Sequence, residues 1–237
     1  MDKELMDKEV LCILDTRQIQ RFMFRSNSYI DSLGGSDLIK HILDDAIRYA
    51  LSHIDTPLVE SEYDLSIDPD GPIPYLSSER IKFQLIISTA GNALCIVRTG
   101  ELCSKIIRKI SRYYLDHGYS LNITAATTLK SNDFGMDIFN LYQNLNRIKA
   151  SSDISNPLGA LPIIAREKNT GNPAIGIDEN GNYYSKDSLI RRNEASKRSV
   201  IIDMQDKLSA KEFYVAMTRA MKKIHVISSS PQITLES

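Results

Sequence analysis

Two β-rich runs separated by a very short break constrain the fold of this chain most strongly. Residues 81–89 and 93–98 are rich in isoleucine, leucine and valine, and only Ala90, Gly91 and Asn92 lie between them. Glycine and asparagine readily adopt the backbone conformations that join adjacent antiparallel strands. The chain therefore contains a β-hairpin, and we expect an antiparallel sheet around it.

Hydrophobic periodicity predicts the elements on either side of this hairpin. Residues 10–15 begin with an apolar run that is typical of a buried strand and ends at Asp15. Gly34 and Gly35 precede apolar residues spaced by three and four, which predicts a helix capped by Ser36 or Asp37. The other predicted elements are a short helix at 17–26, helices at 36–53, 101–117 and 134–149, and a strand at 119–128.

The order of these elements through residue 128 is βααββαβ, which predicts an α+β protein with a ferredoxin-like arrangement. We expect four antiparallel strands, with residues 10–15 central and flanked by residues 81–89, and both long helices on one face. The predicted domains are a ferredoxin-fold domain at 1–150, a loop-rich segment with a basic helix at 151–198, and a C-terminal strand-helix-strand, an α/β extension, at 199–237.

Composition excludes several classes of protein and of site. The 237 residues include 29 basic and 30 acidic residues, so no global charge recruits nucleic acid or an anionic membrane. Neither the three cysteines nor the four histidines have the spacing of a metal site. The charged N-terminus and the lack of a long apolar stretch predict a cytoplasmic protein that does not enter a membrane.

Asp15 is the first candidate functional residue. In a sheet of the predicted topology, the end of the first strand meets the hairpin tip at Gly91 and Asn92. Two carboxylates at such a point can hold magnesium against the phosphates of a nucleotide. An aspartate after a strand is equally expected to cap the next helix, so Asp15 is either a residual metal ligand or a cap.

Three segments carry a resemblance to a known family: residues 14–22, residues 34–39 from Gly34 to Ile39, and residues 88–94 around the hairpin tip. They resemble the palm domains, related to GGDEF domains and nucleotide cyclases, of the large polymerase-like subunit of type III CRISPR effector complexes. The first, degenerate palm and its stand-alone bacterial relatives are the most similar. The loop at 156–184 and the helix opening at 184–188 also look similar to that group, so the resemblance covers roughly residues 9–196 and implies a role in phage defence.

The hairpin departs from the active pattern of that family. Active members have Gly-Gly-Asp-Asp, whereas this chain has Ala90, Gly91, Asn92 and Ala93. Asp15 is left as the only charged ligand, which is too little to hold magnesium tightly. The resemblance therefore implies a catalytically degenerate palm that acts as a nucleotide-binding or interaction module. An active oligonucleotide cyclase using Asp15 with acids such as Asp31 or Glu101 is the alternative.

The resemblance implies a nucleotide site at Asp15, Gly91, Asn92 and the glycines of the following helix. If the helix begins after Gly34 and Gly35, the free N–H groups at Ser36 point toward a bound phosphate. Glycines before a helix are also common as simple turns. We expect Gly34, Gly35 and Ser36 to converge with the hairpin tip.

Residues 213–224 resemble the last conserved motif of UvrD-type helicases. The resemblance implies that Arg219 touches an ATP γ-phosphate, that Tyr214 packs beside it, and that Thr218 belongs to the same motif. The chain has no phosphate-binding loop of its own. The segment is thus either structural or an accessory module that supplies Arg219 to another ATPase.

A basic stretch precedes this motif. It can contact the phosphates of nucleic acid, or it can form a solvated helix face. Its members are Lys186, Arg191, Arg192, Lys197 and Arg198.

Overall fold

The computed structural model describes residues 7–26, 28–66, 80–89, 91–118, 120–151, 163–197, 224–226 and 233–235. The chain divides into two compact units. The first comprises Met1–Ile19 and Ile39–Pro157, and the second comprises Gln20–Leu38 and Leu158–Ser237. None of the described helices is long and apolar enough to cross a bilayer.

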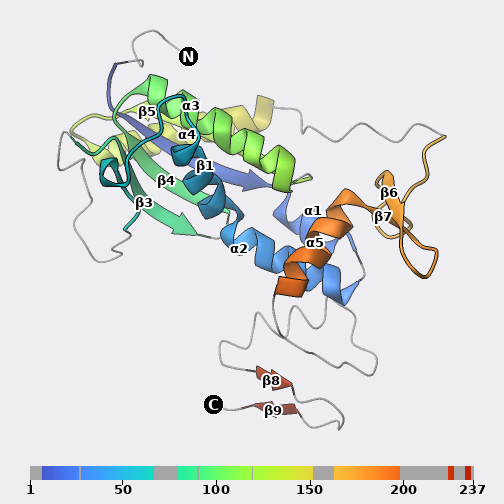
Figure 1. Cartoon of the computed structure of the whole chain (residues 1–237). Helices are drawn as coiled ribbons and strands as arrows, with labels where there is room; N and C mark the ends of the chain where they lie inside the picture. The colour runs from blue at the N-terminus through green and yellow to red at the C-terminus, as the bar shows by residue number, and fades with distance from the viewer. Residues whose placement is uncertain are drawn as a thin grey trace. The chain divides into compact units, whose positions relative to one another are not determined.

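The first unit is built on a five-stranded sheet with the order β2-β3-β4-β1-β5 (Figure 1). The central strand β1 pairs antiparallel with β4 on one side and with β5 on the other. At the edge, β2 pairs parallel with β3, so the sheet is mixed. The strands are β1 (Val10–Arg17), β2 (Tyr63–Asp64), β3 (Phe83–Thr89), β4 (Asn92–Val97) and β5 (Asn122–Leu129).

The predicted hairpin is confirmed, because β3 and β4 pair antiparallel on either side of Gly91. Two details of the predicted sheet were wrong. The hairpin strand beside β1 is β4 rather than residues 81–89, which lie one strand further out. The sheet is also not wholly antiparallel, since Tyr63 and Asp64 of the expected irregular connection add the parallel edge strand β2.

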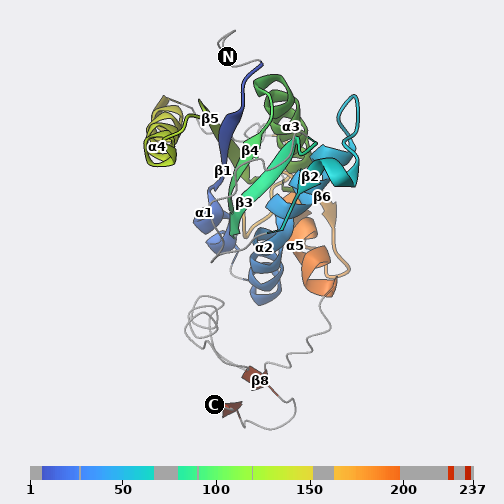
Figure 2. The same cartoon turned by 90° about the vertical axis from the view of Figure 1, so that its left-hand side faces the viewer.

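Helices cover both faces of this sheet (Figure 2). Helix α4 (Phe134–Ser151) packs on the face of the sheet that carries Leu11 and Ile13 of β1. The opposite face meets α3 (Gly100–Tyr113) and the C-terminal part of α2 (Tyr29–Ser52). The buried core on the α4 face consists of Leu11, Ile13, Ile96, Ala126, Leu141 and Leu145.

Hydrogen bonds from β1 and β3 fix α2 and α3 on the same face, as predicted. Thr16 of β1 bonds the Tyr114 hydroxyl at the end of α3, with 2.7 Å between the oxygens. Ser88 of β3 donates to the Asp44 carboxylate of α2. Tyr114 begins a turn of π-helix, Tyr114–Gly118, that ends α3.

The second unit contains most of α1 (Ile19–Phe24), the first turns of α2, and the helix α5 (Lys186–Lys197). Two short antiparallel hairpins accompany them. They are formed by β6 (Ala174–Ile177) with β7 (Tyr183–Ser185), and by β8 (Ile224–Val226) with β9 (Ile233–Leu235).

Helix α2 begins earlier than the sequence predicts. The Ser28 side chain accepts the Asp31 backbone N–H at 3.4 Å, so the helix starts at Tyr29 rather than after Gly35. The glycines serve helix packing instead. A Cβ on Gly34 would lie 1.8 Å from the Arg191 carbonyl oxygen, so only glycine permits the backbones of α2 and α5 to approach this closely.

Candidate functional site

The sheet brings Asp15 and the hairpin tip together, as the sequence predicts. Asp15 of β1 lies directly opposite Asn92 of β4 and opposite Thr124 of β5. Asn92 is in turn opposite Thr89 of β3. Because directly paired residues share a face of a sheet, a row of four polar side chains crosses one end of the sheet.

Gly91 shapes the tip beside this row. Its φ of 93° is a conformation that glycine adopts without strain, and its carbonyl accepts the Thr16 N–H at 2.7 Å. A Cβ at this position would lie 2.6 Å from the Ile19 side chain. The tip is therefore held closely against the end of β1, with Asn92 exposed beside it.

Lys149 completes the arrangement at Asp15. Its Nζ lies 2.8 Å from Asp15 Oδ2, and the two side chains are 32% and 16% exposed. Arg17 donates to the Lys149 carbonyl oxygen at 3.4 Å. Sequence analysis did not identify Lys149, because only the packing of α4 across β1 places the last turn of this helix over the strand end.

On the opposite face of the same strand end, Tyr114 is buried beside Thr16. Burial raises the pKa of Tyr114, although the hydrogen bond between Tyr114 and Thr16 acts to lower it. The phenol therefore stays protonated at neutral pH and holds the strand end in place, rather than acting as a base.

The acids considered as further metal ligands are engaged elsewhere. Glu101 pairs with Lys105 on α3 at 3.0 Å. In the second unit, Asp31 is buried and accepts hydrogen bonds from Ser26 Oγ at 2.7 Å and Arg192 Nε at 3.2 Å. Across the described part of the chain, no cluster of three or more histidine, cysteine or acidic side chains could hold a metal ion.

Gly34, Gly35 and Ser36 lie within α2 and belong to the second unit, whereas Asp15, Gly91 and Asn92 belong to the first. Their backbone N–H groups are inside a helix that begins at Tyr29, so they are bonded within it. The free helix start on which a phosphate site at these three residues was predicted is therefore absent.

The basic stretch of α5 is not a simple solvated face. Arg191 is fully buried, with its guanidinium 4.4 Å from the centre of the Phe22 ring. Burial lowers the pKa of Arg191, against the opposing effect of Asp187 and other nearby carboxylates. Arg192 is paired with Asp31.

Lys186 is the first residue of α5, and the remaining predicted residues lie outside the described part of the structure. They are Tyr214, Thr218, Arg219, Arg198 and the side chain of Lys197. The role of the helicase-like segment therefore stays a prediction.

Comparison with known proteins gives distant structural similarity. No protein-family model matches the chain, and no curated protein matches it. The chain is similar in structure to part of Csm1, the polymerase-like large subunit of type III CRISPR complexes.

Three solved structures illustrate this similarity. A Csm1–Csm4 cassette in complex with cA4 matches over 61% of this chain, with a TM-score of 0.42 and 14% identity. A Csm1–Csm4 cassette in complex with pppApApA matches over 68% of this chain, with a TM-score of 0.45 and 10% identity. Csm1 of T. onnurineus matches over 62% of this chain, with a TM-score of 0.41 and 15% identity. This chain spans 19%, 21% and 20% of those three chains, respectively.

Proposed function

We propose that this chain is a ferredoxin-like palm protein that has lost metal-dependent nucleotidyl transfer and binds a nucleotide phosphate at the end of β1. The observation that carries the proposal is the contact between Asp15 and Lys149. The carboxylate that a metal would need is held by an ammonium group at 2.8 Å. Its strand neighbour Asn92 supplies an amide where a second carboxylate would stand.

Charge favours a phosphate over a metal at this position. Lys149 and Arg17 bring two cations to the strand end, while Asp15 brings one anion. A divalent cation entering here would be repelled by the ammonium group, whereas a phosphate would be attracted by the net positive charge. The exposed Asn92 amide can donate to and accept from a base or a ribose.

The sequence resemblance extends this proposal to a biological setting. A palm related to CRISPR polymerase subunits but without catalysis fits a binding or interaction role in phage defence. Under this proposal the nucleotide is a ligand and not a substrate.

Calorimetric titration with ATP, in magnesium and in EDTA, tests the binding step. We expect the same affinity in both buffers, and a loss of roughly ten-fold in Lys149→Ala, because one charge-assisted contact is removed. Lys130→Ala is the matched control, since Lys130 pairs with Glu9 at 3.2 Å beside the opposite end of β1. Equal losses in the two variants would contradict the proposed position.

A product assay tests the absence of catalysis. The protein incubated with ATP, GTP and manganese is expected to give no more cyclic or linear oligonucleotide than an Asp15→Ala control. A product that this substitution abolishes would instead establish the cyclase alternative.

A further inference from the structure

Four aromatic rings form a row where α2 and α3 pack together. The ring of His53 stacks on Tyr49 with 4.2 Å between centroids, and Tyr49 contacts Tyr113 at 5.3 Å. Tyr113 stacks in turn on His117 at 4.0 Å. All four residues belong to the first unit: Tyr49 is on α2, His53 directly follows α2, Tyr113 ends α3, and His117 lies in the π-helical turn after α3. Helices α2 and α3 cover one face of the sheet of that unit (Figure 2).

The two histidines at the ends of the row are exposed and fixed in orientation. His53 Nδ1 lies 2.9 Å from the Tyr49 carbonyl oxygen and 2.8 Å from Ser52 Oγ. His117 Nδ1 lies 3.1 Å from the Tyr113 carbonyl oxygen. Among the described residues, each of these exposed histidines stacks on one tyrosine ring, and we infer that its solvent-facing side can take a further flat group.

Basic side chains lie on α3, the helix that ends with Tyr113 of the ring row. Helix α3 carries four basic residues, Lys105, Arg108, Lys109 and Arg112, against one acidic residue, Glu101. Lys109 lies one turn before Tyr113 and so next to the row. In the described residues, Lys109, Arg108 and the exposed Arg48 of α2 form no ion pair, whereas Lys105 pairs with Glu101 and Arg112 with Asp116.

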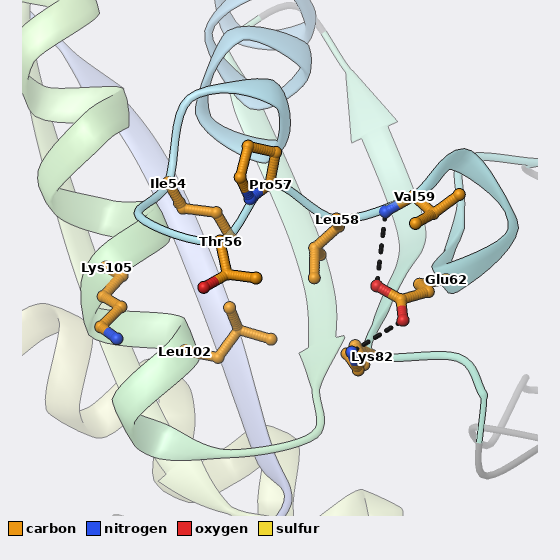
Figure 3. Close-up of a pocket in the computed structure, with 9 residues that line it drawn as sticks. All are labelled: Ile54, Thr56, Pro57, Leu58, Val59, Glu62, Lys82, Leu102 and Lys105. Atoms are coloured by element: carbon orange, nitrogen blue, oxygen red, sulfur yellow. Dashed lines mark hydrogen bonds and ion pairs between the residues drawn. The ribbon is translucent and has the colours of Figure 1, made fainter.

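A pocket of about 280 Å³ lies beside the same helices (Figure 3). Ile54, which follows His53 directly, lines it together with Leu58 and Leu102. Lys105 lines it too, one turn of α3 from Lys109. The hydroxyl of Thr56 and the Lys82–Glu62 ion pair add polar groups at its edge.

We propose that the ring row, the basic residues of α3 and the adjacent pocket bind single-stranded nucleic acid. Bases stack on the free faces of His53 and His117, Lys109 and Arg48 contact phosphates, and one unstacked base enters the pocket. Aromatic platforms beside cationic side chains are the general means by which proteins bind unpaired strands.

A single strand fits this surface better than a duplex does. Only an unpaired strand offers its base faces to side chains, because a duplex stacks them on one another. The pocket has apolar walls and a polar edge, which matches the flat faces and the hydrogen-bonding edge of one base. The basic residues give affinity but carry no information about sequence.

Fluorescence anisotropy with a short labelled single-stranded oligoadenylate, as RNA and as DNA, tests the proposal on the full chain. We expect binding of both strands, or a preference for one, and clearly weaker binding of the matched duplex. His53→Ala/His117→Ala should weaken binding roughly ten-fold through lost stacking. Lys109→Glu should weaken it and lower the salt dependence, because phosphate contacts release counterions.

Matched controls lie on α4, which covers the other face of the sheet (Figure 2). Tyr142→Ala and Arg147→Glu alter an exposed ring and an exposed cation there. They should leave binding unchanged, and circular dichroism should confirm that all variants are folded. Equal binding of duplex and single strand, no binding of either, or equal losses in the α4 controls would overturn the proposal.

This surface is distinct from the phosphate site proposed at Asp15, which lies on the α4 face of the sheet. Lys149→Ala should therefore leave oligoadenylate binding unchanged while it weakens ATP binding. Loss of strand binding in that variant would contradict two separate sites.

Discussion

At the scale of the residue, one lysine decides the chemistry of the sheet end. The Lys149 ammonium neutralises Asp15 at 2.8 Å, and Asn92 directly opposite has no charge. Magnesium and manganese prefer oxygen ligands with negative charge, and this position offers one carboxylate that is paired with an ammonium group and one neutral amide. Substitution of Asn92 and Lys149 tests this account.

We predict that Asn92→Asp/Lys149→Ala binds manganese, because it restores two unpaired carboxylates on adjacent strands. Calorimetric titration with manganese alone should show saturable binding in this variant and none in the wild type. Asn92→Asp with Lys149 retained should bind at least ten-fold more weakly, since the ammonium remains at Asp15. Equal binding by the single and double variants would show that Lys149 does not exclude the metal.

At the scale of the element, two adjacent glycines of α2 have different surroundings. A Cβ on Gly34 would lie 1.8 Å from the Arg191 carbonyl oxygen, while a Cβ on Gly35 would lie 3.5 Å from the side chains of Met23 and Phe22. The first distance is a backbone clash and the second is an ordinary contact. Alanine at Gly34 therefore tests the packing of α2 against α5, while alanine at Gly35 tests the helix propensity of α2.

We predict opposite effects of alanine at these two positions. Gly34→Ala should lower the free energy of unfolding by about 2 kcal/mol or more, because α5 must move away. Gly35→Ala should raise it by up to about 1 kcal/mol, because alanine favours the helix. Chemical denaturation followed by circular dichroism measures both, and a loss of equal size in the two variants would refute this account of the packing.

At the scale of the whole molecule, buried carboxylates occur in both units of the chain. Asp31, Glu167 and Asp187 are almost fully buried in the second unit. Burial tends to raise the pKa of Glu167, but hydrogen bonds from Ser185, Thr170 and Ser188 bring the pKa below its ordinary value. A depressed pKa stabilises the folded state above the unfolded pKa, and the stability is lost as the pH falls.

We predict that acid loosens the second unit around Glu167. Hydrogen exchange measured by mass spectrometry should show reduced protection in residues 163–197 below a pH of about 4. In Glu167→Gln this acid-induced loss should be shallower, whereas the exposed Glu179→Gln should behave as the wild type. A pH profile unchanged by Glu167→Gln would show that another group controls the acid response.

Local sequence patterns are enough to predict several elements of this fold. The hairpin around Gly91 and helices α3 and α4 follow from turn chemistry and from apolar spacing along continuous segments. The meeting of the β1 end with the hairpin tip also follows from the element order, whereas the direct pairing of Asp15 with Asn92 depends on β4, rather than residues 81–89, lying beside β1.

Other features depend on contacts between segments far apart in the chain, and no local pattern predicts them. The glycines looked like a helix start, because the approach of α5 to Gly34 leaves no local signal. The burial of Arg191 and the placement of Lys149 on Asp15 likewise come from packing between distant elements. A local pattern predicts the secondary structure of one segment. The residue that a side chain contacts depends instead on which distant element packs against that segment.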